Sequence, residues 1–337
     1  MDESREQPRV AIIGAGHRGR GWAALALSRG WPVALYDSEF GLLRRAGGEV
    51  ADRVRRLTDL GRADPVRAAG AEALLRVGRS LLHAVGDADF ILDAMPLDLG
   101  AKQRLLEQVE QVAHPEAITV SFSATMHAGQ LCARLRRPER FLVIHSLDPV
   151  ELVPLVEVVP GARTDPACTR QVRAWLERLD RHTVVLRREV PGNASGRILA
   201  AVWRECIHLV LTGVVDIEDV DRIVSLGPAI AWAVAGPYLS QVMGAGARGP
   251  GFYLSEALQQ NEALWGELAS WRQLSAEDRQ RLVRLVERVY DEEPSELRAH
   301  RDRFLARLLQ AVESGDETHL ELAGDEDEDQ EPGVASA

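Results

Sequence analysis

The fold of this chain is decided by the stretch Arg9-Val10-Ala11-Ile12-Ile13-Gly14-Ala15-Gly16-His17-Arg18-Gly19. Its first five residues form an apolar run typical of a buried strand. Three glycines with G-x-G-x-x-G spacing follow at once, and a helical pattern then runs from about Arg20 to Gly30. In a strand–turn–helix unit such glycines permit a tight turn, let the backbone approach a pyrophosphate, and allow close helix–strand packing. The pattern predicts a Rossmann-type unit whose loop has these cofactor-binding residues: Gly14, Gly16, His17, Arg18 and Gly19.

An acidic residue follows the second predicted strand. The run Pro32-Val33-Ala34-Leu35-Tyr36 ends in Asp37, about 20 residues after the glycines, where dinucleotide-binding units carry an acidic side chain. We expect Asp37 to accept hydrogen bonds from the adenosine ribose, and its charge would repel a 2′-phosphate. The sequence therefore predicts NAD as the cofactor. NADP is the less favoured alternative, which Arg44 and Arg45 keep open, although a pair of helical arginines is usually a solvated face.

The composition sets outer limits on the function. The chain has 337 residues, more than one domain usually holds, and a formal net charge of −11. Ten acidic residues and no lysine or arginine follow Val312, so the rest of the chain is close to neutral. A nearly neutral body offers no basic face to nucleic acid. The acidic run at 325–329 predicts a disordered tail over residues 313–337.

No targeting, membrane or metal signal is expected. No stretch approaches the roughly 18 apolar residues of a membrane-spanning helix. The polar first seven residues lack signal-peptide character. No cluster of histidine, cysteine or acidic residues has metal-ligand spacing. The cysteines also lack redox spacing, so we expect a cytoplasmic protein with reduced thiols. The three cysteines are Cys132, Cys168 and Cys206.

The remaining hydrophobic patterns predict an α/β half followed by a helical half. Apolar runs at 90–96, 117–121 and 183–186 are predicted strands, and residues 198–210 repeat apolar side chains at three- and four-residue steps. Pro191-Gly192 marks a hinge, because proline cannot continue the preceding strand. The predicted fold is a doubly wound Rossmann-type sheet over residues 1–189 and an all-α domain over residues 190–312.

The candidate catalytic pair lies near the end of the first half. His145 and Glu157 are twelve residues apart in Arg140-Phe141-Leu-Val-Ile-His-Ser-Leu-Asp-Pro-Val-Glu-Leu-Val-Pro-Leu-Val-Glu157. An imidazole exchanges a proton near neutral pH, and a neighbouring carboxylate fixes its tautomer and stabilises its charged form. Beside a dinucleotide, such a pair suits oxidation of an alcohol or reduction of a ketone.

This stretch resembles the R-F-x-x-x-H-x-x-N-P…L-V-E-V signature of the 3-hydroxyacyl-CoA dehydrogenase superfamily. The resemblance covers nearly all of residues 9–270 and implies that His145 is the acid/base and Glu157 its partner. The phrase Trp203-Arg204-Glu205-Cys206-Ile207-His208-Leu209-Val210 is similar to a W-R-E-A-x-H-L-V element of one branch. That branch contains carnitine dehydrogenase and L-gulonate 3-dehydrogenase (lambda-crystallin). It implies a homodimer paired through the helical domain.

The resemblance also assigns two residues to the nicotinamide half of the cofactor. The family carries a V-E-A-x-x-E-N-x-x-x-K pattern, in which Asp93 stands at the first acidic position and Lys102 at the lysine. The alternative is that Asp93 caps the end of a strand and that Lys102, the single lysine of the chain, lies on the surface.

Two positions of the family site are altered. The serine of the S-x-T-S-S turn falls on Ala124, and the asparagine of P-G-F-x-x-N-R falls on Gly196. In the family, this serine and this asparagine donate hydrogen bonds to the substrate oxygen. Loss of one such donor commonly lowers the rate by about 10²–10³ at oxyanion sites. The predicted substitutes are Ser123 in the turn and Asn193 near the start of the long helix. Ser121 and Thr125 are further candidates, and Asn193 is just as readily a helix N-cap.

Further departures concern the substrate. Residues 40–88 are shorter and free of lysine where acyl-CoA members carry a CoA-gripping insertion, so CoA is not expected. The carnitine and gulonate branch has an arginine before an aromatic residue, and here Ala231 precedes Trp232. This departure argues against a small anionic substrate. A larger or more apolar hydroxy or keto compound is expected, such as a polyketide-like biosynthetic intermediate.

The leading prediction is an NAD(H)-dependent oxidoreductase that interconverts a secondary alcohol and a ketone on a non-CoA small molecule. The altered positions motivate an alternative. In this alternative the protein is a superfamily member whose pocket catalyses a non-redox reaction, namely cyclisation, dehydration or isomerisation. A catalytically silent NAD-binding protein is the third hypothesis.

Overall fold

The computed structural model describes residues 7–96, 98–244, 248–290 and 293–314. All but two residues of the predicted acidic tail lie outside the described ranges. The chain divides into two compact units, the first formed by Met1–Ile217 with Leu268–Tyr290 and the second by Glu218–Glu267 with Asp291–Ala337. These units do not coincide with the domains 1–189 and 190–312, which stay a prediction.

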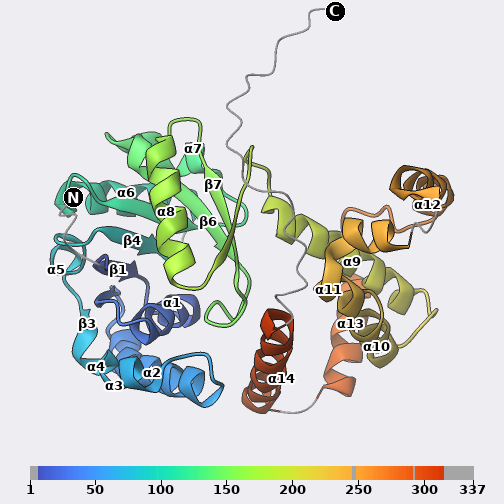
Figure 1. The fold of residues 1–337 in the computed structure, drawn as a ribbon, viewed down its shortest axis with the longest axis horizontal. Helices are drawn as coiled ribbons and strands as arrows, with labels where there is room; N and C mark the ends of the chain where they lie inside the picture. Colours follow the sequence, from blue (N-terminus) through green and yellow to red (C-terminus); the bar gives the residue numbers. More distant parts are fainter. Residues whose placement is uncertain (1–6, 97, 245–247, 291–292, 315–337) are drawn as a thin grey trace, which may run out of the picture. The chain divides into compact units, whose positions relative to one another are not determined.

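The first unit is built on an eight-stranded sheet, with the strand order β3-β2-β1-β4-β5-β6-β7-β8 (Figure 1). The strands are β1 (Val10–Ile13), β2 (Val33–Tyr36), β3 (Leu75–Gly78), β4 (Phe90–Asp93), β5 (Ile118–Phe122), β6 (Phe141–Ser146), β7 (Leu155–Pro160) and β8 (His182–Val185). All neighbours are parallel except β6 and β7, which are antiparallel. The strand order reverses between β1 and β4, where open α/β sheets bind their ligands.

Helices alternate with these strands. They are α1 (His17–Ser28), α2 (Phe40–Asp59), α3 (Pro65–Ala69), α4 (Ala71–Leu74), α5 (Leu81–Val85), α6 (Leu99–Val112), α7 (Ala128–Leu131), η1 (Cys132–Arg134), η2 (Pro138–Arg140) and α8 (Pro166–Arg178), followed by α9 (Asn193–Leu211) and α13 (Ala276–Val289). Asp98 and Asp165 cap α6 and α8 by accepting hydrogen bonds from backbone N–H groups of the first turn. α1 begins three residues before its predicted start, because Gly16 takes the extended N-cap conformation.

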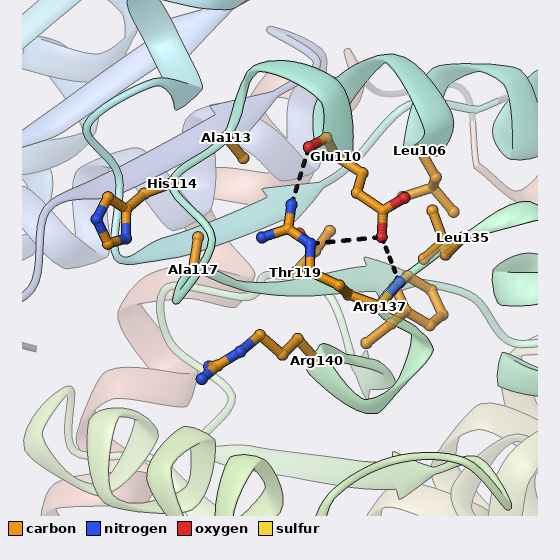
Figure 2. A pocket seen from close by; sticks show the side chains of 10 residues that line it. Leu106, Glu110, Ala113, His114, Ala117, Thr119, Leu135, Arg137 and Arg140 are labelled. Atoms are coloured by element: carbon orange, nitrogen blue, oxygen red, sulfur yellow. Dashed lines mark hydrogen bonds and ion pairs between the residues drawn. The ribbon is translucent and has the colours of Figure 1, made fainter.

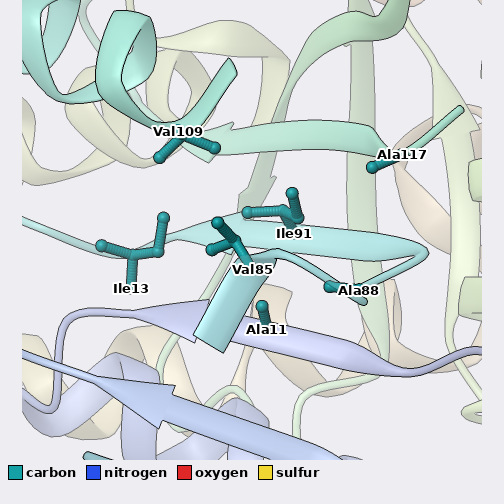
Figure 3. Close-up of a cluster of buried hydrophobic side chains, with 7 residues drawn as sticks. All are labelled: Ala11, Ile13, Val85, Ala88, Ile91, Val109 and Ala117. Atoms are coloured by element: carbon teal, nitrogen blue, oxygen red, sulfur yellow. The ribbon is translucent and has the colours of Figure 1, made fainter. Parts of the chain in front are cut away.

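Two clusters of buried side chains hold the sheet and its helices together. In Figure 3, side chains of β1 and β4 meet those of α5 and α6. The first cluster consists of Ala11, Ile13, Val85, Ala88, Ile91, Val109 and Ala117. The central strands are buried on both faces, which explains their continuous apolar runs. A second cluster packs α6 and α7 against β6 and β7 and holds β6, which carries His145; its members are Leu106, Ala128, Leu131, Cys132, Phe141, Val143 and Val159.

The described part of the second unit is helical. It contains α10 (Ile217–Leu226), α11 (Pro228–Met243), α12 (Pro250–Trp265) and α14 (Pro294–Ser314). The backbone of α11 breaks at Gly236, which has a φ of 65° and precedes Pro237. The predicted fold class is therefore confirmed, a Rossmann-type sheet followed by helices.

No single helix among the described residues is long and apolar enough to cross a bilayer. The pair formed by α10 and α11, bent by 46°, meets the length and composition requirement only when both are taken together.

Candidate active site

The loop between β1 and α1 leaves room only for glycine at two of its three positions. Gly14 has a φ of +109°, and an added Cβ would lie 3.0 Å from the backbone carbon of Ala94. A Cβ on Gly19 would lie 1.8 Å from the carbonyl oxygen of Gly14. A Cβ on Gly16 would meet nothing within 4 Å. The open side at Gly16, at the N-terminus of α1, fits the approach of a pyrophosphate.

Asp37 joins this loop to the end of β2. The residue is 3% exposed, and its carboxylate accepts hydrogen bonds from the backbone N of Ala15 at 2.7 Å and from that of Glu39 at 2.8 Å. A carboxylate has about four acceptor sites, so two remain for ribose hydroxyls. The glycine loop and Asp37 therefore fit a dinucleotide, with Asp37 at the predicted ribose position.

Both basic side chains of the loop contact other side chains of the protein. His17 Nδ1 lies 2.8 Å from Arg53, which also forms an ion pair with the buried Glu151. Burial and then the charge of Arg53 lower the pKa of His17 below its ordinary value of 6.5, so this imidazole is neutral at cellular pH. Arg18 Nη2 lies 3.1 Å from Asp148 Oδ2 and thereby links the glycine loop to the segment after β6.

The predicted catalytic pair is brought together by strand pairing. His145 on β6 stands directly opposite Glu157 on β7 in the antiparallel register. Directly opposite residues project from the same face of a sheet, with their Cβ atoms about 5 Å apart. His145 Nδ1 lies 2.8 Å from Glu157 Oε2, and their side chains are 10% and 3% exposed.

Glu157 also accepts hydrogen bonds from the first turn of α9. Its Oε1 accepts hydrogen bonds from the backbone N of Ala194 and of Ser195, both at 2.9 Å, and its Oε2 accepts one from Ser195 Oγ at 2.6 Å. Burial raises the pKa of Glu157, but the hydrogen bonds from Ser195 and His145 outweigh it, so its pKa lies below the ordinary value. The carboxylate is thus held ionised beside the imidazole.

This lowered pKa predicts a pH dependence of stability. We expect Glu157→Gln to lower the free energy of unfolding by about 2 kcal/mol near pH 7, because buried donors lose a charged acceptor. A carboxylate with a depressed pKa contributes stability that is complete above its unfolded pKa and disappears as pH falls through the folded one. The difference from wild type should therefore shrink as pH falls below about 4.5.

Urea titrations from pH 7 down to pH 3 measure this difference. Glu177→Gln is the matched control, since its side chain is 54% exposed and its pairing with Arg173 should contribute less than about 1 kcal/mol. A Glu157→Gln difference that stayed constant to pH 3 would contradict the prediction.

A second buried network lies where β4 meets α6. Lys102 Nζ lies 2.7 Å from Asp93 Oδ2 and 3.2 Å from Ser121 Oγ, and Ser121 donates a hydrogen bond to the same Asp93 oxygen at 2.7 Å. Lys102 is 3% exposed, so the alternative in which it lies on the surface is wrong. Asp93 also accepts a hydrogen bond from the backbone N of Met95, as a strand-end cap would.

The two predicted substitute donors contact each other. Asn193 Nδ2 donates to the backbone carbonyl of Ser123 at 3.1 Å, and Ser123 Oγ accepts a hydrogen bond from the backbone N of Met126 at 2.7 Å. Asn193 is 4% exposed, so its amide ties the β5 turn to α9. The N-cap of α9 is Gly192, so the alternative in which Asn193 is the N-cap is wrong.

Ser195 is the residue that the sequence analysis missed. It contacts both members of the pair, since its Oγ also lies 3.2 Å from His145 Nδ1. The altered positions beside it carry no polar side chain. The Ala124 carbonyl accepts a hydrogen bond from the backbone N of Gly192, and a Cβ on Gly196 would meet nothing within 4 Å. The available signal was its place in the P-G-x-x-x-x-R stretch, one residue before Gly196.

A separate pocket contains charged groups that are already paired (Figure 2). Glu110 accepts hydrogen bonds from the backbone N of Arg136 and of Arg137, and Arg140 forms an ion pair with Glu116. None of the residues predicted for the site lines this pocket. Its charges stabilise the loop before β6. No group of three or more metal-ligand side chains occurs in the part of the chain that the structure describes.

The glycine loop, Asp37 and the His145–Glu157 pair define the class of NAD-dependent dehydrogenases. Sequence profiles agree: the 3-hydroxyacyl-CoA dehydrogenase NAD-binding domain matches residues 9–190, and the C-terminal domain of the same family matches residues 192–284. The chain belongs to the 3-hydroxyacyl-CoA dehydrogenase family, as its motifs predicted.

Individual relatives are similar over most of their length. An L-carnitine dehydrogenase of Oceanobacillus iheyensis is 30% identical over 306 residues, covering 90% of this chain and 98% of the relative. That of Nocardiopsis dassonvillei is 32% identical, with 90% and 91% covered. A solved 5-formyl-3-hydroxy-2-methylpyridine 4-carboxylic acid 5-dehydrogenase, an NAD⁺-dependent dismutase, has a TM-score of 0.78 and 26% identity, with 91% of this chain and 99% of that chain covered.

Proposed function

We propose that this protein interconverts a secondary alcohol and a ketone on a small molecule not linked to CoA, with NAD(H) as cofactor. The observation that carries the proposal is the buried His145–Glu157 pair, in which the carboxylate is saturated with hydrogen bonds and remains ionised. When bound, NAD accepts or supplies the hydride. The protein's own residues move the accompanying proton.

His145 is the proposed acid/base. Its Nδ1 is occupied by Glu157, so Nε2 is the nitrogen that takes the hydroxyl proton in oxidation and returns it in reduction. Glu157 stabilises the imidazolium without accepting the proton. Asp37 favours NAD over NADP, because a 2′-phosphate would meet its carboxylate. Asp93 and Lys102 are proposed to support the nicotinamide side as one buried ion pair.

The proposed substrate is larger or more apolar than carnitine, such as a polyketide-like intermediate. Support comes from the two altered positions, since Ala124 has only a methyl group and the side of Gly196 is open. The lysine-free segment 40–88 supports a substrate without CoA. Ser123 remains the proposed hydroxyl donor to the substrate oxygen, because its Oγ accepts a bond from Met126 and its proton stays free to donate. Asn193 is proposed to hold that turn in place.

Binding and turnover test the proposal. Purified protein is titrated with NADH and with NADPH by energy transfer from tryptophan, and non-CoA hydroxy and keto compounds are then screened. We expect micromolar NADH binding, weaker NADPH binding, and one NADH formed or consumed per substrate converted. Conversion of a substrate with no net change in NADH would overturn the redox proposal.

That outcome would favour the non-redox alternative of cyclisation, dehydration or isomerisation. The observation behind this alternative is the absence of both family donors at Ala124 and Gly196. The double back-substitution Ala124→Ser with Gly196→Asn separates loss of function from a changed reaction. If the double variant gains dehydrogenase activity that the wild type lacks, loss of the two donors explains the inactivity. If the double variant also lacks dehydrogenase activity, the pocket performs a different reaction.

A homodimer is proposed through the helical part of the chain. The support is the apolar surface that α10 and α11 of the second unit expose, where Leu226 is 72% and Tyr238 79% exposed. Exposed apolar patches of this kind usually mark a protein interface. Sedimentation equilibrium should give twice 37.1 kDa. Three free cysteines are consistent with the proposed cytoplasmic location, which cell fractionation would test.

A further inference from the structure

Ser195 contacts both catalytic side chains from the first turn of α9. Its Oγ lies 2.6 Å from Glu157 Oε2 and 3.2 Å from His145 Nδ1, and its backbone N donates to Glu157 Oε1 at 2.9 Å. The residue is neither a donor to the substrate in the family pattern nor part of the pair itself. Its three contacts nevertheless include both carboxylate oxygens of Glu157 and the Nδ1 atom of His145.

The proton positions follow from which groups can donate. An ionised carboxylate only accepts, so the Ser195 hydroxyl proton points to Glu157 Oε2. The lone pairs of Ser195 Oγ then face His145 Nδ1, which already has a carboxylate oxygen at 2.8 Å. Two acceptors surround Nδ1, so this nitrogen carries the proton of the neutral ring. The Nε2 lone pair is left for the substrate.

The same contacts saturate the carboxylate. Glu157 Oε1 accepts two backbone N–H groups, and Oε2 accepts the Ser195 hydroxyl and the imidazole N–H. A carboxylate with four donors at the N-terminus of a helix is strongly stabilised as the anion. It therefore does not compete for the proton that His145 exchanges.

We propose that Ser195 is a positioning residue that holds His145 as the Nδ1–H tautomer and keeps Glu157 ionised. The proposal rests on the proposed function only in taking His145 as the acid/base. In this proposal Ser195 acts through its contacts with His145 and Glu157. Its role can therefore be measured without knowing the substrate.

The test compares Ser195→Ala with Ser195→Thr in the full-length protein saturated with NADH. Nitrogen-15 NMR reports the tautomer of His145, assigned by the resonance lost in His145→Gln, and carbon-13 NMR follows the titration of Glu157. In Ser195→Ala we expect the pKa of Glu157 to rise and part of the His145 population to shift to the Nε2–H tautomer, because Nδ1 keeps only the Glu157 acceptor. Ser195→Thr, which keeps the hydroxyl, should match wild type. Ser225→Ala is the control, because its hydroxyl bonds to the Asp221 carbonyl within its own helix, α10.

Turnover provides the second measurement. With any substrate found, kcat of Ser195→Ala should fall about tenfold with KM unchanged, the loss expected for a charge-assisted hydrogen bond of about 1.5 kcal/mol. An unchanged tautomer and titration in folded Ser195→Ala would overturn the inference while leaving the proposed function standing. A changed tautomer in a protein that never turns over NADH would retain the inference and reject the function.

Discussion

His145→Gln is expected to lower kcat/KM by about 10³-fold and to leave NADH affinity within about twofold of wild type. Glutamine retains a hydrogen-bond donor toward Glu157 and nearly fills the volume of the imidazole, so the strand pair β6–β7 should stay intact. It has no group that exchanges a proton near pH 7. The proton released with each hydride would then pass to water, which is neither positioned nor basic enough.

Rapid-mixing kinetics and NADH titration measure the two quantities separately. His182→Gln is the matched control, because this exposed histidine lies on the edge strand β8. Its rate should equal that of wild type. If folded His145→Gln retained more than about a tenth of the wild-type rate, the proposed acid/base would have to be another group.

Gly19→Ala is expected to abolish measurable NADH binding and to destabilise the protein by about 3 kcal/mol. The added methyl would lie 1.8 Å from the carbonyl oxygen of Gly14 and 3.3 Å from a side-chain carbon of Ile12. A backbone oxygen cannot rotate away as the end of a side chain can. Either α1 must move off the sheet or the loop must open, and both remove the pyrophosphate site.

Two other glycine substitutions provide the comparison. Gly16→Ala should keep its thermal stability but bind NADH more weakly, because its methyl would meet no protein atom within 4 Å and would point where the pyrophosphate approaches. Gly48→Ala, in the middle of α2 with open space around it, should add about 0.5–1 kcal/mol of stability and leave binding unchanged. Unaltered NADH binding by Gly19→Ala would contradict the assigned loop geometry.

The sequence predicted much of the fold because its signals are local. The apolar runs, the three glycines and Asp37 each belong to a short segment whose conformation depends on nearby residues. The family motif predicted Glu157 as the partner of His145, and the structure places the two residues opposite each other in the antiparallel register of β6 and β7.

Residues distant in the chain were harder to assign. Ser195 is 38 residues from Glu157 and 50 from His145, and no periodicity records which donors meet a carboxylate across such separations. For the same reason, the sequence did not decide whether Lys102 lies on the surface or in the core. Its partners Asp93 and Ser121 stand on neighbouring strands, and only their parallel register aligns them.

The sequence by itself determined the Rossmann-type loop and the family, and it predicted the His145–Glu157 pair, because each depends on residue types at fixed short spacing. Tertiary structure alone decided that α9 begins at the Glu157 carboxylate, that Ser195 completes the pair, and that Asn193 binds the β5 turn. These contacts arise because the order of the strands and the position of the first turn of α9 bring distant backbone segments within hydrogen-bonding distance. The meeting of a helix N-terminus with a buried carboxylate is a property of three-dimensional packing, and the local pattern of residues does not contain it.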